Sequence, residues 1–338
     1  MKTKQILIVA SFIINVSVGC ATNVPDAKIN FKIMDESGKP LANIPVNVNT
    51  LTDVKPGAGF GDSVYTHKII TTDDQGLTTW ESPSMDGSFS FWVSGLPGYY
   101  KGGCNYRFEK SDLARWQPWN PTVELKLRSI GKPIPMYAII TRNFTLPEIG
   151  KSIGFDLMIS DWVMPYGKGL KSDLIFHLDR KPDRTVKTKD YYKRDVKLFD
   201  ATLTVSFSNP NDGIQPIPTN NEYIGCEFSI PRFAPESGYA TNLIQRTYCE
   251  SADQQIVSST NEKLGYFYRV RTVKQNDKIV SSHYGKMGNI NFGVIGSPTA
   301  IINFTYYLNP TPNDRNMEFD PKRNLFMNLN EFEQVTAP

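Results

Sequence analysis

The sequence predicts an all-β protein with two domains, and three observations support this prediction. The chain has 338 residues, which exceeds the usual size of one compact core. Aromatic residues make up 12% of it, beside 24 Gly and 23 Pro, a composition that favours short strands and tight turns over long helices. Short segments of alternating polar and apolar residues recur along the chain. We therefore expect an N-terminal β-sandwich followed by a larger antiparallel β-sandwich or jelly-roll-like domain.

The N-terminus has the features of an export signal. Lys2 and Lys4 precede an apolar stretch over residues 6–14, which is too short to span a bilayer. Residues 17–20 read Ser-Val-Gly-Cys, and small residues directly before a cysteine resemble a bacterial lipobox. We expect residues 1–20 to be a lipoprotein-type signal peptide and Cys20 to anchor the exported protein to a bacterial membrane. Cleavage after Ala21 without lipidation is the alternative.

The charge of the exported chain gives no sign of a nucleic-acid partner. The formal charge is +3, and removal of Lys2 and Lys4 leaves 3 − 2 = +1. So small a net charge creates no field that attracts nucleic acid. The locally basic stretch 180–197 also contains Asp183, Asp190 and Asp195, which indicates a solvated loop.

The cysteines predict a disulfide and no metal site. If Cys20 is lipidated, Cys104, Cys226 and Cys249 remain, and export permits disulfides. Cys226 and Cys249 fall in one predicted domain, so we expect them to pair. Whether Cys104 stays free or pairs with one of them is left open. The cysteine spacing matches no zinc site, and we expect neither a metal nor a cofactor.

Residues 27–130 form the first predicted domain. Turn residues separate its alternating segments: Asp35, Gly38, Pro40 and Leu41; then Thr72, Asp73 and Gly76; then Gly98-Tyr99. This layout resembles the transthyretin-like or carboxypeptidase-regulatory-like sandwich, and bacterial Ig-like modules share much of it. The resemblance implies an accessory or adhesion-like module rather than a catalyst. Residues 101–120 depart from the pattern as a Trp-rich insertion.

Residues 136–330 form the second predicted domain, after the stiff segment with Pro133 and Pro135. The stretches at residues 154–179, 231–239 and 306–326 resemble a family of exported bacterial proteins, and this resemblance, which spans most of residues 130–330, implies no activity. Short helices are expected at residues 191–196 and 241–249. Strands are expected at residues 155–163, 173–179, 201–207, 222–230, 266–273, 278–284, 289–294 and 301–308.

Two pairs of residues are the candidate ligand-binding positions. Asp161 and Trp162 lie beside a glycine-rich turn, where a carboxylate and an indole suit a sugar. The alternative, which we favour, is that Asp161 caps that turn through backbone amides. Trp116 and Trp119 lie in the insertion of the first domain and are the best candidates for an exposed aromatic patch.

The sequence favours binding over catalysis. It has neither G-x-S-x-G nor H-E-x-x-H, and its only histidines are His67, His177 and His283. We therefore expect a non-catalytic cell-envelope lipoprotein with a binding or structural role toward a protein, glycan or matrix ligand. The alternative is a glycan hydrolase in the second domain. Its carboxylate pair would come from Asp156, Asp161 and Asp173, in an open cleft.

Overall fold

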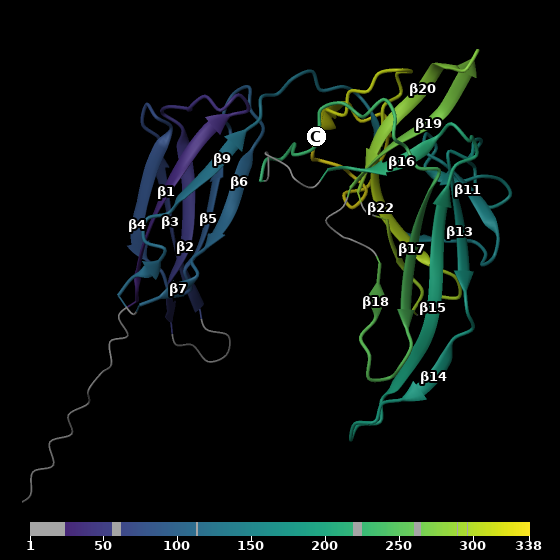
Figure 1. The fold of residues 1–338 in the computed structure, drawn as a ribbon, viewed down its shortest axis with the longest axis horizontal. Helices are drawn as coiled ribbons and strands as arrows, with labels where there is room; N and C mark the ends of the chain where they lie inside the picture. Colours follow the sequence, from purple (N-terminus) through teal and green to yellow (C-terminus); the bar gives the residue numbers. More distant parts are fainter. Residues whose placement is uncertain are drawn as a thin grey trace, which may run out of the picture. The chain divides into compact units, whose positions relative to one another are not determined.

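The computed structural model describes residues 24–55, 62–112, 114–218, 225–259, 265–288, 290–295 and 297–338 (Figure 1). The predicted signal peptide and Cys20 lie outside these residues. Within them every regular element is a β-strand except one short 3-10 helix, η1 (Pro321–Arg323). The predicted all-β fold is thus confirmed. No helix among the described residues is long and apolar enough to cross a bilayer.

The chain divides into two compact units. The first comprises the chain up to Lys32 together with residues 42–92 and 105–124. The second comprises residues 33–41, 93–104 and the chain from Leu125 to Pro338. Two segments that neighbour the first unit in sequence therefore belong to the second.

Two antiparallel sheets account for most strands before residue 130. Their strand orders are β4-β1-β9 and β3-β2-β5-β6. In β1 the residues alternate between buried and half-exposed positions, as a strand with one face on a core requires. Phe31 of β1 and Phe91 of β5 lie with ring centroids 4.4 Å apart, which joins the two sheets face to face. The strands are β1 (Asp26–Asp35), β2 (Pro45–Lys55), β3 (Asp62–Thr71), β4 (Leu77–Pro83), β5 (Ser88–Val93), β6 (Gly102–Arg107) and β9 (Thr122–Leu127), with the small pair β7 (Lys110–Ser111) and β8 (Trp116–Gln117).

The later strands form two larger sheets. The first has the order β10-β22-β20-β19-β16, with β21 also paired to β22. Its strands are β10 (Tyr137–Thr145), β16 (Gly213–Pro216), β19 (Tyr266–Gln275), β20 (Lys278–Met287), β21 (Asn291–Gly293) and β22 (Ile301–Leu308). The second has the order β12-β11-β13-β15-β17-β18, with β14 also paired to β15. Its strands are β11 (Ser152–Asp156), β12 (Asp161–Trp162), β13 (Leu174–Arg180), β14 (Arg184–Lys187), β15 (Asp195–Ser206), β17 (Asn242–Cys249) and β18 (Val257–Ser258).

An aromatic core lies between these two sheets. Phe155 of β11 lies 5.7 Å from Phe304 and 6.3 Å from Tyr306, both on β22 (centroid to centroid), each edge to face. Such geometries add to the stabilisation that burial of the rings gives. One continuous cluster of buried residues runs through both sheets. This second sandwich matches the larger antiparallel domain that the sequence predicts.

Three predicted elements differ from the structure. Residues 242–249 form strand β17 and not a helix, with Gln245, Thr247 and Cys249 buried on one face. The other predicted helix, at residues 191–196, is absent because the chain turns there, with Lys193 at φ +42°. Within the expected strand at residues 222–230, the described part from Gly225 onward forms no strand.

The predicted Cys226–Cys249 disulfide is wrong. Both thiols are free, and they lie in different hydrophobic clusters. Cys226 packs with Tyr100 and Phe228. Cys249 ends β17 in the main core, with its Sγ 3.5 Å from the carbonyl oxygen of Ser251. A disulfide requires the backbones and side chains of its two cysteines to lie close together, and membership of one predicted domain does not ensure this.

Candidate functional site

The chain reverses once before it reaches the predicted glycine-rich turn. Strand β11 ends at Asp156, and β12 folds back on it with Phe155 opposite Trp162 and Asp156 opposite Asp161. Ser160, at φ +57°, reverses the chain, and its N–H donates to the carbonyl of Asp156 at 2.8 Å. A tight hairpin therefore replaces the single strand expected at residues 155–163.

Asp161 holds the turn that follows. One carboxylate oxygen accepts the N–H of Trp162 at 2.8 Å, and the other accepts the N–H of Lys168 at 2.9 Å. Gly167 lies so close that an added Cβ would be 2.4 Å from the carbonyl oxygen of Trp162. The prediction that Asp161 caps this turn is confirmed. Both of its oxygens are already committed to backbone amides.

Trp162 is a core residue and not an exposed platform for a sugar. It is 5% exposed. Its ring lies 5.4 Å from Phe155, 5.5 Å from Phe176 and 5.1 Å from Phe144, measured between centroids. Its indole N–H donates to the carbonyl of Thr145 at 3.2 Å. The predicted ligand contact of Asp161 with Trp162 is therefore wrong, because the indole has no free face.

Asp156 and Asp173 lie together below the surface and share one arginine. Each is 2% exposed. Arg271 of β19 donates from Nε and one Nη to the two oxygens of Asp173, at 2.8 and 2.7 Å. The same Nη donates to Asp156 at 3.0 Å. Because Arg271 belongs to the other sheet, its guanidinium ties the two sheets together through charge-assisted hydrogen bonds.

Backbone amides complete the environment of Asp156. Its oxygens accept N–H groups from Met158, Leu170 and Lys171 at 2.9–3.0 Å. Burial works against its charged form. These three N–H groups and Arg271 outweigh that effect and hold the pKa of Asp156 below its ordinary value. This carboxylate is thus stabilised as an anion and has no role as a proton donor near neutral pH.

A third buried carboxylate, Asp212, fixes the backbone of Arg271. Its oxygens accept the N–H groups of Arg271 and Thr272, both at 2.9 Å. Arg271 itself has φ +57°, at a break in the register between β19 and β20. Burial raises the pKa of Asp212, and the hydrogen bonds from Thr272 oppose that rise. Asp212 thus holds in place the bulge that aims Arg271 at the opposite sheet.

This arrangement contradicts the hydrolase alternative. A glycosidase needs two carboxyl groups that face a substrate in an open cleft. Asp156 and Asp173 instead face the same guanidinium and are buried, and Asp161 caps a turn. Their arrangement is that of a structural ion-pair network.

His177 takes part in an exposed Ser–His–Asp series. Ser152 and His177 lie opposite each other on β11 and β13, with Ser152 Oγ 3.2 Å from His177 Nδ1. His177 Nε2 lies 3.4 Å from a carboxylate oxygen of Asp179. The Asp179 side chain is 72% exposed, so water screens its charge. This differs from a catalytic triad, in which a buried carboxylate orients the histidine.

In the first unit, Trp116 and Trp119 are both half-buried. The Trp116 indole N–H donates to the carbonyl of Ser84 at 2.7 Å, and its ring lies against Gly87, where an added Cβ would be 2.7 Å from it. The guanidinium carbon of Arg115 lies 4.6 Å from the centroid of the Trp119 ring. Trp116 thus has a structural role, and a ligand contact at Trp119 stays a prediction.

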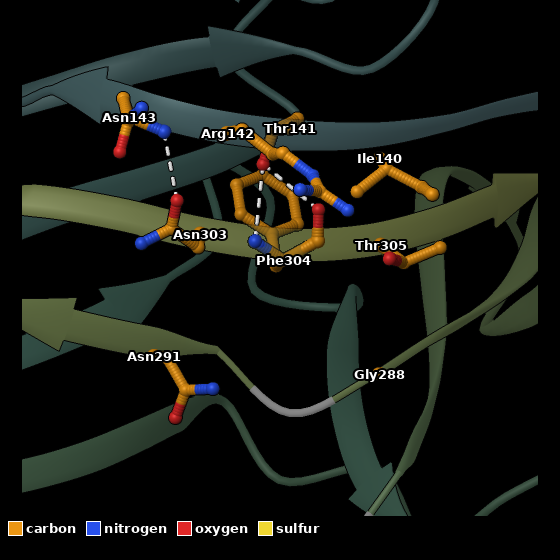
Figure 2. Close-up of a pocket in the computed structure, with 9 residues that line it drawn as sticks. All are labelled: Ile140, Thr141, Arg142, Asn143, Gly288, Asn291, Asn303, Phe304 and Thr305. Atoms are coloured by element: carbon orange, nitrogen blue, oxygen red, sulfur yellow. Dashed lines mark hydrogen bonds between the residues drawn. The ribbon is translucent and has the colours of Figure 1, made fainter. Parts of the chain in front are cut away.

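A polar cleft that the sequence did not predict lies on the sheet of β10 and β22 (Figure 2). It has a volume of about 520 Å³. It opens where two strands interrupt their pairing with β22: at the bulge between Thr141 and Phe144 of β10, and at Gly288 between β20 and β21. Its lining residues are Ile140, Thr141, Arg142, Asn143, Gly288, Asn291, Asn303, Phe304 and Thr305.

Three asparagines form a row across the cleft. Asn303 of β22 lies opposite Asn291 of β21, and its side-chain oxygen accepts the N–H of Asn143 at 2.7 Å. Asn143 adopts φ +55° at the bulge, a conformation that asparagine tolerates better than most residues. Figure 2 shows the row running from Asn143 over Asn303 to Asn291. Side-chain amides offer both donors and acceptors, which suits a ligand rich in hydroxyl groups.

Arg142 adds a positive charge to this row. It is exposed and has no ion-pair partner among the residues that the structure describes. Its guanidinium carbon lies 5.8 Å from the ring centroid of Phe332, which is 58% exposed. The cleft therefore combines amides, one unpaired guanidinium and an adjacent exposed aromatic ring. Over the described part of the chain, no group of three or more His, Cys, Asp or Glu side chains is placed to hold a metal ion.

Neither a scan of protein-family models nor a comparison with curated proteins gives a match to this chain. Among solved structures, a streptococcal ancillary pilin matches at 11% identity and a TM-score of 0.21, over 64% of this chain and 60% of the pilin. The chain thus spans about three fifths of that protein's length. A shaft pilin, SpaA of Lactobacillus rhamnosus GG, matches at 12% identity and a TM-score of 0.21, over 77% of this chain and 92% of the pilin. TM-scores this low support no conclusion about fold or function.

Proposed function

We propose that this chain is an exported, non-catalytic protein of the cell envelope that binds an acidic glycan in the cleft between β10, β22 and β21. The observation that supports this most directly is the exposed Arg142, which has no ion-pair partner among the described residues, beside the row of Asn143, Asn303 and Asn291. A guanidinium offers paired donors to a carboxylate, and amides serve the hydroxyl groups around it.

The class of ligand follows from charge and shape. A uronic acid carries one carboxylate and several hydroxyl groups on one ring, which matches one guanidinium beside three amides. Phe332 adds an exposed ring close to Arg142, suited to the apolar face of a sugar. The three acids considered for hydrolysis, Asp156, Asp161 and Asp173, are in contrast committed to Arg271 and to backbone amides. Binding without cleavage is therefore the better account.

Binding to immobilised alginate and hyaluronan oligosaccharides, with dextran as the neutral reference, tests this proposal. We expect the acidic glycans to bind and Arg142→Ala to weaken them by about tenfold or more. Asn303→Ala should weaken them less. The matched control is Arg184→Ala, an exposed arginine on β14 outside the cleft. Equal binding of dextran, or unchanged binding by Arg142→Ala, would rule the proposal out.

We also propose that Cys20 carries the lipid that holds the chain at the membrane. The lipobox-like residues 17–20 support this. Cys20→Ser should release the protein from the membrane fraction while glycan binding by the purified chain stays the same. If Cys20→Ser leaves processing and membrane fractionation unchanged, the chain is not a lipoprotein of this kind.

A further inference from the structure

Lys286, near the end of β20, is a buried cation with no acidic partner in the part of the chain that the structure describes. It is 5% exposed. Its amine lies 5.0 Å from the ring centroid of Phe228 and 4.3 Å from that of Tyr307. None of the described carboxylates lies within ion-pair distance of it. A buried lysine without a partner is rare, because removing an ammonium from water is costly.

Glu318 is the carboxylate whose charge acts on Lys286, and it is already committed to other donors. Glu318 is fully buried, and its Oε1 accepts hydrogen bonds from Tyr100 at 2.7 Å and Arg232 at 2.6 Å. The backbone N–H groups of Gly131 and Lys132 also donate to its two oxygens, at 2.7 and 2.9 Å. Its lone pairs are therefore largely used by other donors.

The remaining charges leave Lys286 as the surplus cation. Arg128 lies 4.7 Å from the centroid of the same Phe228 ring. Arg128 and Arg232 both approach Glu36, at 3.6 and 3.5 Å. Among the described residues, the carboxylates of Glu36 and Glu318 are both engaged by these arginines. Burial lowers the pKa of Lys286 to about 7, with Glu318 opposing and Arg128 adding to that effect.

A cavity of about 230 Å³ lies beside this amine. Its wall is largely apolar and includes Ile217, Phe228, Ile230 and Met287, together with the ring of Tyr307. Glu227, which is exposed and therefore screened by water, also lines the cavity, and so do Ala337 and Pro338. The volume is below that of a site for a drug-sized molecule, so the occupant is small.

We infer that this cavity is a binding site for a small carboxylic acid with an apolar body, whose carboxylate pairs with the ammonium of Lys286. The apolar wall takes the body of the ligand, and its carboxylate pairs with the ammonium of Lys286, which has no acidic partner among the described residues. A neutral analogue of the same shape leaves the amine without that partner, so it binds more weakly. This inference is independent of the glycan cleft, which uses none of the charged residues named here.

Calorimetric titration of the whole chain with benzoate tests the site, with benzamide as the neutral analogue of matched shape. We expect benzoate to bind at least about tenfold more tightly than benzamide. Lys286→Met should reduce benzoate binding to the benzamide level, whereas Lys274→Met, at an exposed lysine on β19, should leave it unchanged. In the wild type, affinity for benzoate should fall by about tenfold per pH unit above about pH 7, as the free amine loses its proton.

Three results would overturn the inference. They are no benzoate binding at about 10 mM, equal binding of benzamide, and unchanged benzoate binding by Lys286→Met. If Lys286→Met did not fold, the comparison of benzoate with benzamide on the wild type would still test the inference. A flat affinity for benzoate between about pH 6 and pH 9 would show that no titrating amine pairs with the ligand.

Discussion

Arg271 and Lys286 are both cations below the surface of the second unit, and they differ in what faces them. Arg271 donates to two carboxylates of the opposite sheet, and a third carboxylate holds its backbone. Lys286 faces two aromatic rings and a cavity. The first arrangement offsets the desolvation of its charges with hydrogen bonds, whereas the second leaves the desolvation largely uncompensated. The difference separates a charge that holds the fold together from one that is available to a ligand.

The largest effect is expected at Arg271. Arg271→Met removes the partner of two carboxylates that are each 2% exposed, so the free energy of unfolding should fall by about 3–5 kcal/mol. Urea denaturation at neutral pH measures it. The deficit should shrink as the pH falls, because the loss of Arg271 removes one of the causes that hold the pKa of Asp156 low, so Asp156 takes up a proton more readily.

The matched control is Arg246→Met. Arg246 also donates from Nε and Nη to one carboxylate, that of Asp200, at 2.8 and 3.1 Å, but its side chain is 44% exposed. That variant should lose far less stability than Arg271→Met, because water screens an exposed ion pair. Equal losses at Arg246 and Arg271 would mean that burial does not decide the contribution of these ion pairs.

Lys286 should show a smaller effect of opposite sign. Its pKa of about 7 lies below that of an unfolded lysine, so the unfolded chain binds more protons and wild-type stability rises with pH from about 7 to about 10. The cost of the buried charge is therefore full below about pH 7. Lys286→Met, which removes it, should raise the free energy of unfolding by on the order of 2–4 kcal/mol at about pH 6.

The pH dependence separates charge from shape at Lys286. The gain from Lys286→Met should fall by roughly half or more by about pH 9.5, where the wild-type amine is neutral in the folded chain. Denaturation at both pH values measures this gain. A gain that is the same at both would mean that methionine merely packs better against Phe228 and Tyr307.

These two cations also illustrate which features of the structure can be predicted from the sequence and which cannot. Alternation predicted most strands, and the position of Asp161 before a glycine-rich turn predicted its capping role, because both depend on neighbours in sequence. The partners of Arg271 are 98 and 115 residues away, and a bulge aims its side chain. No local pattern carries that information.

The missed cleft and the misassigned strand have the same cause. Asn143, Asn291 and Asn303 read as ordinary polar positions, and only strand pairing places them in one row. The sequence predicts a helix at residues 241–249, yet β17 (Asn242–Cys249) pairs along β15 and its residues alternate in burial. In both cases the pairing between strands, which no local sequence pattern reveals, determines the structure.

The smallest of the three effects is expected at Asp161, whose half-buried carboxylate lies between these extremes. Asp161→Ala leaves the N–H groups of Trp162 and Lys168 without acceptors, although water reaches part of the turn. We expect a loss of about 1–2 kcal/mol in urea denaturation and faster amide exchange at Lys168. Asp161→Asn keeps one acceptor oxygen and should lose about half as much. Asp179→Ala, at an exposed carboxylate of β13, is the control and should change little. If Asp161→Ala and Asp179→Ala were equally stable, the turn would be held by its glycines and Pro165 alone, and the carboxylate would contribute nothing.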